Sequence, residues 1–186
     1  MKRLFDLILV LILSCLLAFP FVLIWLAVRL TSIGPAFYWS DRVGINNKIF
    51  RMPKFRTMIE DSPVIATDLL NDPEIYLTTI GACLRKSSLD ELPQLWSIFI
   101  GHMSFVGPRP ALFNQDELIA LRTSRGVHEI LPGLTGWAQV NGRDDLPIYV
   151  KVEYDAEYLT RQSIWFDIKI LGMTLVKVIK SDGVSH

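Results

Sequence analysis

The clearest pattern in the sequence is a long apolar stretch close to the N-terminus. Residues 7–28 are apolar apart from Ser14 and Pro20. As a straight helix this stretch would measure about 33 Å, which is comparable with the hydrocarbon core of a bilayer. It is longer than the apolar core of a cleaved signal peptide, and residues 28–31 form a poor small-residue cleavage site. The pattern therefore predicts a segment that enters lipid.

Two features favour a re-entrant hairpin over a single transmembrane anchor. Pro20 lies near the middle of the stretch, where a proline costs a straight helix roughly 3 kcal/mol and produces a bend. Basic residues stand on both flanks, Lys2 and Arg3 before the stretch and Arg29 after it, which places both flanks on the cytoplasmic side. Each arm would be about 18 Å long and would penetrate one leaflet. We expect residues 1–35 to form this hairpin, with the single anchor as the alternative.

The rest of the chain, residues 36–186, is expected to form one cytoplasmic catalytic domain without internal repeats. Residues 48–55 alternate as in a strand, and residues 129–141 read as turns around a short strand. The helical patterns cover residues 116–123, 148–161 and 164–180. We therefore predict an α+β fold, in which a re-entrant membrane helix-break-helix precedes a small globular domain of amphipathic helices with a short β element.

The last of these helices is strongly amphipathic. On a helical wheel Asp167, Lys169 and Lys177 fall on one side, and Trp165, Leu175 and further apolar residues lie opposite them. The pattern is typical of a helix that packs its apolar face on a core. Insertion of that face between lipid headgroups is the alternative.

Composition and charge exclude several classes of protein. Of the 186 residues 51% are hydrophobic and 20% charged, which excludes intrinsic disorder. The 19 basic and 19 acidic side chains cancel and give no attraction for a nucleic acid polymer. The two cysteines do not suggest a disulfide-stapled scaffold, and the three histidines lack the spacing of a zinc site. The glycine spacing of residues 131–143 matches neither a dinucleotide-binding motif nor a P-loop.

Two adjacent carboxylates, Asp90 and Glu91, are the strongest candidates for chemistry. They follow two hydroxyls and two cations in residues 85–91. In a structural interpretation Ser88 and Glu91 form a capping box, although Pro93 would then disturb the new helix. In a functional interpretation one carboxylate acts as nucleophile or base while its neighbour holds a divalent metal ion.

Arg109 is the strongest candidate for binding an anion. It lies between Pro108 and Pro110, which stiffen the backbone. A guanidinium held in this way can grip phosphate oxygens with little loss of entropy, although a surface arginine in a rigid turn would give the same pattern. The segments around Lys54 and around Arg143 supply further cations, which could equally form a solvated face.

Four ordered motifs carry a resemblance to a known family. They are KFRTM at residues 54–58, SLDELPQL at 88–95, MSFVGPRP at 103–110 and PGLTGWAQVNGR at 132–143. Together they resemble the monotopic phosphoglycosyl transferases, the bacterial sugar transferase family, in its minimal catalytic form. The similarity extends over nearly the whole chain.

The resemblance implies a reaction, its substrates and a location. A sugar 1-phosphate would pass from a UDP-sugar to polyprenol phosphate, such as undecaprenyl phosphate, with release of UMP and ping-pong kinetics. The enzyme would lie in one leaflet of the bacterial inner membrane, on its cytoplasmic face, with a re-entrant helix broken at a proline. It would carry out the first membrane step of glycoconjugate assembly.

The resemblance also implies roles for particular residues. Asp90 would be the nucleophile that forms a covalent phosphosugar intermediate, Glu91 together with Asp90 would hold Mg²⁺, and Arg109 would contact phosphate. Further site candidates, from family similarity and charge, are Arg56, Arg85, Arg143, Asp167, Gln139 and Asn141. For Asp167 a structural ion pair with one of the arginines is the alternative.

Two positions depart from the family pattern. Phe19 stands where the family commonly has a serine before the membrane proline, and His102 stands where it commonly has an aspartate. Two other functions also fit the residues. They are a metal-dependent phosphatase or pyrophosphatase acting on lipid-linked substrates, and a membrane-anchored scaffold for glycan assembly.

Overall fold

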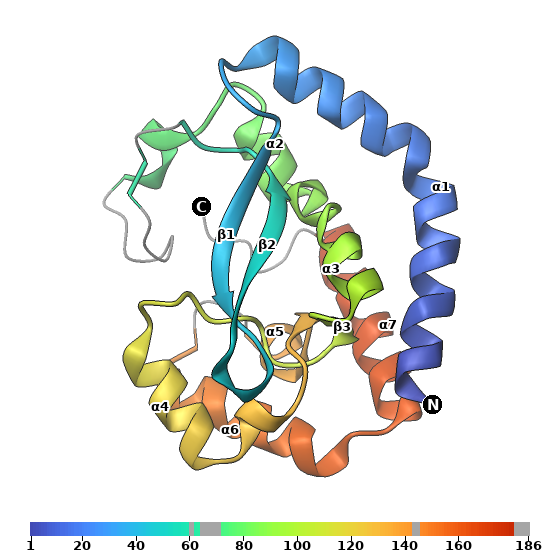
Figure 1. The fold of residues 1–186 in the computed structure, drawn as a ribbon, viewed down its shortest axis with the longest axis vertical. Helices are drawn as coiled ribbons and strands as arrows, with labels where there is room; N and C mark the ends of the chain where they lie inside the picture. Colours follow the sequence, from blue (N-terminus) through green and yellow to red (C-terminus); the bar gives the residue numbers. More distant parts are fainter. Residues whose placement is uncertain (60–61, 64–71, 143–145, 181–186) are drawn as a thin grey trace.

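The computed structural model describes the whole chain except residues 60–61, 64–71, 143–145 and 181–186 (Figure 1). In this part of the chain the helices outnumber the strands, and the strands form two separate two-stranded sheets. The α+β class predicted from the sequence is confirmed at this level.

The first element is a long apolar helix, α1 (Lys2–Thr31), which continues across Pro20. Its ribbon runs along one edge of the molecule and changes direction along its length (Figure 1). Among the described residues it is the one helix that is long and apolar enough to cross a membrane. Most of its large apolar side chains are exposed, Phe19 to 73%. A long apolar N-terminal element is therefore confirmed, whereas its entry into and return from one leaflet stays a prediction.

Polar contacts attach the beginning of α1 to the rest of the protein. The Lys2 ammonium lies 2.6 Å from the buried Asp167 carboxylate. Arg3 donates to the carbonyls of Ile98 and Phe99 at 2.5 and 2.7 Å. The buried Asp6 carboxylate accepts a hydrogen bond from the backbone of Phe105. These charged residues precede the apolar stretch, so they fix the helix to the domain.

A second contact attaches the other end of α1. Arg56 donates to the carbonyl and the hydroxyl of Ser32 at 3.1 and 2.8 Å. Val28 packs with Phe55 and Leu84 in a small apolar cluster beside it. Both ends of α1 are therefore held by the same domain.

Two sheets organise the domain. Strands β1 (Phe37–Val43) and β2 (Ile49–Phe55) form an antiparallel hairpin around the 3-10 turn η1 (Ile45–Asn47). Strands β3 (Ser104–Val106) and β4 (Gly133–Thr135) pair in parallel. The predicted strand at 48–55 and the predicted turns around a short strand at 129–141 are confirmed.

The helices of the domain surround these sheets (Figure 1). Helices α4 (Asp116–Ser124), α6 (Ile148–Arg161) and α7 (Ile164–Lys180) confirm the three predicted from periodicity. The shorter elements, which have weaker periodicity, are η3 (Pro73–Tyr76), α2 (Gly81–Lys86), η4 (Leu89–Glu91), α3 (Gln94–Ile100), η5 (Val127–Glu129) and α5 (Trp137–Val140). The main core lies among α1, α3, β3, α6 and α7.

Helix α7 does not pack as its periodicity predicted. Trp165 and Leu175, on the predicted core-facing side, are 82% and 65% exposed, while Asp167 on the polar side is buried. Phe166 and Ile170 are the residues of α7 that enter the core. The physical reason is that Asp167 has partners in the interior, the Lys2 ammonium and the Tyr158 hydroxyl. Of the predicted apolar face Leu171 packs against the core, but most of its other described residues are exposed, so core packing is wrong for the greater part of this face. Insertion of the face between headgroups stays a prediction.

Glycine allows β3 and β4 to approach closely. A Cβ atom on Gly133 would lie 2.1 Å from the backbone nitrogen of Gly107, and one on Gly136 would lie 2.1 Å from the Gly107 carbonyl oxygen. Backbone atoms cannot move aside as a flexible side chain can. The loop that follows β3, which carries Arg109, is therefore seated directly on β4.

We predict that Gly133→Ala lowers the free energy of unfolding by about 1 to 3 kcal/mol or more, because the added methyl group overlaps backbone atoms. The measurement is thermal unfolding in detergent, followed by circular dichroism. Gly172→Ala in α7 is the matched control. A Cβ there meets nothing within 4 Å, so alanine should leave the stability unchanged or raise it by up to about 1 kcal/mol. Equal midpoints for Gly133→Ala and the wild type would contradict the close-approach argument.

Candidate active site

Asp90 and Glu91 lie in η4, a single 3-10 turn between α2 and α3. Ser88 precedes them in a left-handed conformation, with φ of 55°, and its side chain makes no capping hydrogen bond. The structural interpretation as a capping box is therefore wrong. Helix α3 begins only at Gln94, after Pro93, because a proline is acceptable before a helix but not inside its second turn.

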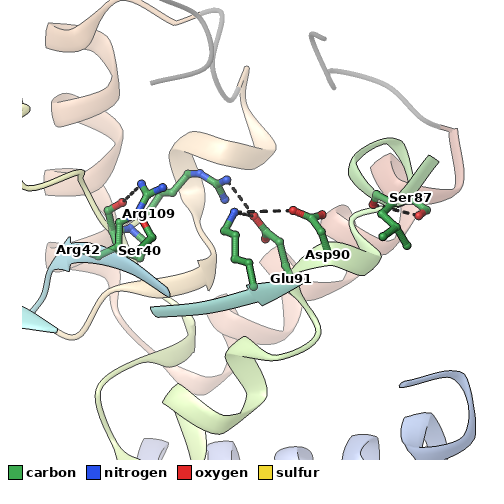
Figure 2. Close-up of polar contacts among 9 residues, drawn as sticks. Ser40, Arg42, Ser87, Asp90, Glu91 and Arg109 are labelled. Atoms are coloured by element: carbon green, nitrogen blue, oxygen red, sulfur yellow. Dashed lines mark hydrogen bonds and ion pairs between the residues drawn. The ribbon is translucent and has the colours of Figure 1, made fainter. Parts of the chain in front are cut away.

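The two carboxylates are buried beside two cations. Asp90 is 6% and Glu91 9% exposed. Glu91 Oε1 lies 2.8 Å from Lys54 Nζ and 3.0 Å from Arg109 Nη2. Lys54 Nζ is also 4.0 Å from Asp90 Oδ2. Figure 2 shows the Arg109 guanidinium directed at Glu91, with Asp90 alongside. Three separate elements, β2, η4 and the loop after β3, thus meet at one carboxylate oxygen.

This arrangement moves the pKa values of the two carboxyl groups in opposite directions. Burial by itself would raise the pKa of Glu91, but Arg109 and Lys54 outweigh burial and lower it. Burial raises the pKa of Asp90, Lys54 opposes this, and the neighbouring Glu91 raises it further. Neighbouring acids with pKa values pushed apart are typical of catalytic sites.

Lys54 is the site residue that the sequence analysis missed, since it was read only as one of several extra cations. Burial lowers the pKa of its ammonium group, while Glu91 and Asp90 raise it. Its position on β2, opposite Tyr38 on β1, brings the side chain to η4. Membership of the first of the four motifs was the signal that could have identified it.

Of the other predicted residues, Arg85 and Gln139 also lie near this site. Arg85, in the last turn of α2, lowers the pKa of Asp90 through its charge. Gln139 donates to the Leu134 carbonyl at 3.1 Å. Its side-chain oxygen is buried and has no hydrogen-bond partner in the described part of the chain.

Three predicted residues make their contacts elsewhere. Arg56 holds Ser32 at the end of α1, and Asn141 donates to the Trp137 carbonyl at 2.7 Å. Asp167 pairs with Lys2, and in the described part of the chain it makes no ion pair with Arg56 or Arg85. Their roles in a reaction stay predictions, and Arg143 lies outside the described residues.

A cavity of about 470 Å³ opens beside Glu91 and Arg109. Its walls are mainly apolar side chains, among them Leu9 and Leu13 from α1 and Leu171 from α7. Its polar lining also includes Lys86, Ser88, Thr135, Gln139, Thr174 and Lys177. The cavity therefore joins the charged cluster to the apolar helix α1 and is suited to an amphiphilic ligand with an anionic head.

The donor set fits one kind of metal ion. Among the described residues no three His, Cys, Asp or Glu side chains are grouped so that they could hold a metal ion. Mg²⁺ is commonly bound by only one or two carboxylates, with substrate phosphate oxygens and water as its other ligands. Asp90 and Glu91 are adjacent in the chain and buried together, so they fit Mg²⁺ that arrives with a phosphate substrate.

At the two departures from the family pattern, the side chains make ordinary contacts. The His102 ring lies edge-on against Phe50, with 5.6 Å between ring centroids. Phe19, just before Pro20, is largely exposed on α1. The His102 contact does not involve Asp90 or Glu91.

Comparison with known proteins finds relatives over nearly the whole chain. Residues 1–181 match the family described as bacterial sugar transferase. The uncharacterized sugar transferase EpsL of Bacillus subtilis is 40% identical over all of this chain and 91% of its own length. The exopolysaccharide production protein ExoY of Rhizobium meliloti is 37% identical over 98% of this chain and 87% of its own length.

A longer relative is named for its reaction. The UDP-glucose:undecaprenyl-phosphate glucose-1-phosphate transferase of Escherichia coli is 40% identical over 95% of this chain. The chain spans only 40% of that protein's length.

The depressed pKa of Glu91 gives a prediction about stability. The ionised group stabilises the fold above pH 4.5, its ordinary pKa, and this stabilisation is lost as the pH falls towards the lower folded-state pKa. Glu91→Gln should therefore reduce the loss of unfolding free energy on acidification below about pH 4.5. Urea unfolding at a series of pH values measures this pH dependence of the free energy of unfolding. Glu117→Gln, at an exposed position, is the control. An unchanged pH dependence in Glu91→Gln would refute the strong ion pairing of Glu91.

Proposed function

The chain belongs to the bacterial sugar transferase family, and from this premise we propose that it transfers a sugar 1-phosphate from a UDP-sugar to polyprenol phosphate, releasing UMP. Undecaprenyl phosphate is the acceptor we propose, by analogy with the names of the relatives. The observation that carries the proposal is the buried Asp90–Glu91 pair, with its cations, beside a mainly apolar cavity that Glu91 and Arg109 line together with residues of α1.

In the first half-reaction Asp90 is the nucleophile. One of its carboxylate oxygens forms a bond to the phosphorus that bears the sugar, and the bond from that phosphorus to the bridging oxygen breaks, so that UMP leaves. A carboxylate and a pyrophosphate repel each other, so the reaction depends on cations that neutralise the phosphate oxygens. Lys54, Arg109 and Arg85 supply positive charge around Asp90.

The protonation state of Asp90 decides whether it can attack. Burial and the neighbouring Glu91 raise its pKa, and the Lys54 ammonium opposes them. Lys54 therefore favours the ionised, nucleophilic form. Asp90 and Glu91 would hold Mg²⁺, which when bound would neutralise phosphate oxygens and orient them for in-line displacement.

In the second half-reaction the acceptor phosphate attacks the same phosphorus. The bond to Asp90 breaks, the carboxylate is regenerated, and a lipid pyrophosphate sugar is formed. Because the donor product leaves before the acceptor reacts, the kinetics should be ping-pong. The apolar walls from α1 and α7 would hold the polyprenol chain, and its phosphate would lie against the cationic lining residues Lys86, Arg109 and Lys177.

The attachment of α1 supports a re-entrant arrangement in the membrane. Its first residues are bound to Asp167 and to the end of α3, and Ser32 after its end is bound to Arg56. A helix that crossed the bilayer would place its two ends on opposite sides. We therefore propose that α1 dips into one leaflet, bends at Pro20 and returns, with the catalytic domain on the cytoplasmic face of the bacterial inner membrane.

We predict that the wild type, given a UDP-sugar, polyprenol phosphate and Mg²⁺, forms UMP and a lipid-linked sugar. Screening several UDP-sugars for released UMP finds the donor. Asp90→Asn should lower the rate by about a thousandfold or more, because the nucleophile is lost. The exposed Asp41→Asn on β1 should keep full activity.

Incubation with the donor alone separates the proposed transferase from its alternatives. The wild type should gain the mass of a sugar phosphate on Asp90 and release at most one UMP per protein. UMP released equally well without lipid over many turnovers would indicate a phosphatase or pyrophosphatase instead. Full activity of Asp90→Asn would refute the assignment of Asp90 as nucleophile. A wild type without any turnover would instead favour the membrane-anchored scaffold.

A labelling experiment tests the membrane arrangement. We predict that a cysteine added before Met1 and one replacing Ile33, which is 97% exposed, are both protected from an impermeant thiol reagent in cells with a permeabilised outer membrane. Both should react after the inner membrane is lysed. Cys15→Ser and Cys83→Ser remove the native thiols. Labelling of one end but not the other before lysis would show a single transmembrane anchor.

A further inference from the structure

The loop that carries Arg109 is held by hydrogen bonds that three of its consecutive carbonyl groups accept. The Pro108 carbonyl accepts from the Gly133 amide at 2.9 Å, that of Arg109 from Arg122 Nη1 at 2.7 Å and that of Pro110 from Arg42 Nη1 at 3.2 Å. Pro108 and Pro110 have no N–H of their own to donate. The position of this part of the backbone therefore depends on the hydrogen bonds that its carbonyl groups accept.

Arg122, on α4, makes the contact to the Arg109 carbonyl, and every nitrogen of its guanidinium is engaged. Nε and Nη2 donate to Asp155 Oδ2 at 2.9 and 2.7 Å, while Nη1 donates to the Arg109 carbonyl. Asp155, on α6, is buried. Because a guanidinium is planar and rigid, fixing one edge against Asp155 also fixes the direction of Nη1.

We propose that Arg122, oriented by Asp155, is a positioning residue that sets the backbone at Arg109 so that the Arg109 guanidinium reaches Glu91. This inference rests on the proposed transferase function. The chain of contacts is continuous: Asp155 holds Arg122, Arg122 holds the Arg109 carbonyl, and Arg109 Nη2 lies 3.0 Å from Glu91 Oε1. Neither Arg122 nor Asp155 is proposed to touch the substrate.

A purely structural role for the pair is the competing explanation. Helices α4 and α6 also meet through apolar side chains, with Leu118 and Val152 buried in one cluster with Ala111. Their packing thus has support besides the ion pair. The ion pair additionally fixes the direction in which Arg122 Nη1 points, and thereby the position of the Arg109 backbone. A misplacement of about 1 Å at a catalytic group can lower the rate about a hundredfold.

The test is a substitution of Arg122 that keeps its positive charge but removes the forked guanidinium group. Lysine has a single nitrogen, which cannot hold Asp155 and the Arg109 carbonyl in the same geometry. Arg122→Lys should therefore lower kcat/KM for transfer by about 10- to 100-fold in a protein that still unfolds cooperatively. Arg125→Lys is the matched control: it is exposed at the end of the same helix and should retain wild-type kcat/KM.

A double-mutant cycle with Arg109→Met separates positioning from general stability. If Arg122 acts through Arg109, the double variant should be no slower than Arg109→Met alone, because the group being positioned is already gone. Multiplying effects of the two substitutions would overturn the proposal. Full activity in Arg122→Lys would overturn it as well.

The outcomes remain distinguishable from failure of the proposed function. A wild type that forms no lipid-linked sugar would refute the transferase itself, whereas an active wild type with multiplying effects would refute only the positioning role. If Arg122→Lys does not fold, Asp155→Asn takes its place in the cycle. Failure of both variants to fold would show that the pair is structural and would overturn the proposal.

Discussion

The fold around the candidate site depends on one carboxylate oxygen, Oε1 of Glu91, which accepts hydrogen bonds from both Lys54 and Arg109. Burying Glu91 without partners would cost several kcal/mol, so β2, η4 and the Pro-Arg-Pro loop must come together for the fold to be stable. Removal of one member of a buried pair typically costs 3 to 5 kcal/mol. The same contacts that permit burial also assemble the proposed phosphate-binding cations around Asp90.

A second consequence is the contrast between the two neighbouring acids. Glu91 takes the two direct ion pairs, and its pKa falls. Asp90 has Lys54 only at 4.0 Å, so burial dominates and its pKa rises. A carboxylate that is buried but only loosely paired gives up little when it forms a bond to phosphorus. The geometry thus supports the proposed roles, with Asp90 as nucleophile and Glu91 as a structural and metal-binding residue.

The attachment of α1 connects this chemistry with the membrane. Apolar packing at Val10 and Val28 holds the helix against the domain. Lys2, Arg3 and Asp6 add polar contacts at its first turns. Held in this way, α1 forms one wall of the cavity that Glu91 and Arg109 also line. A lipid substrate that enters beside α1 would therefore be guided to the charged cluster.

The sequence by itself determined the apolar N-terminal element and the helices α4, α6 and α7, and it singled out Asp90, Glu91 and Arg109 as candidate site residues. Periodicity, proline placement and adjacent charges are local properties, and local physics is enough to interpret them. Tertiary structure alone decided the rest. Lys54 became a site residue through strand pairing, and Asp167 became buried because Lys2, 165 positions away, supplies its countercharge. Arg122 and Asp155 met through the packing of α4 on α6. The burial of a charge depends on a partner distant in sequence, which no local pattern records.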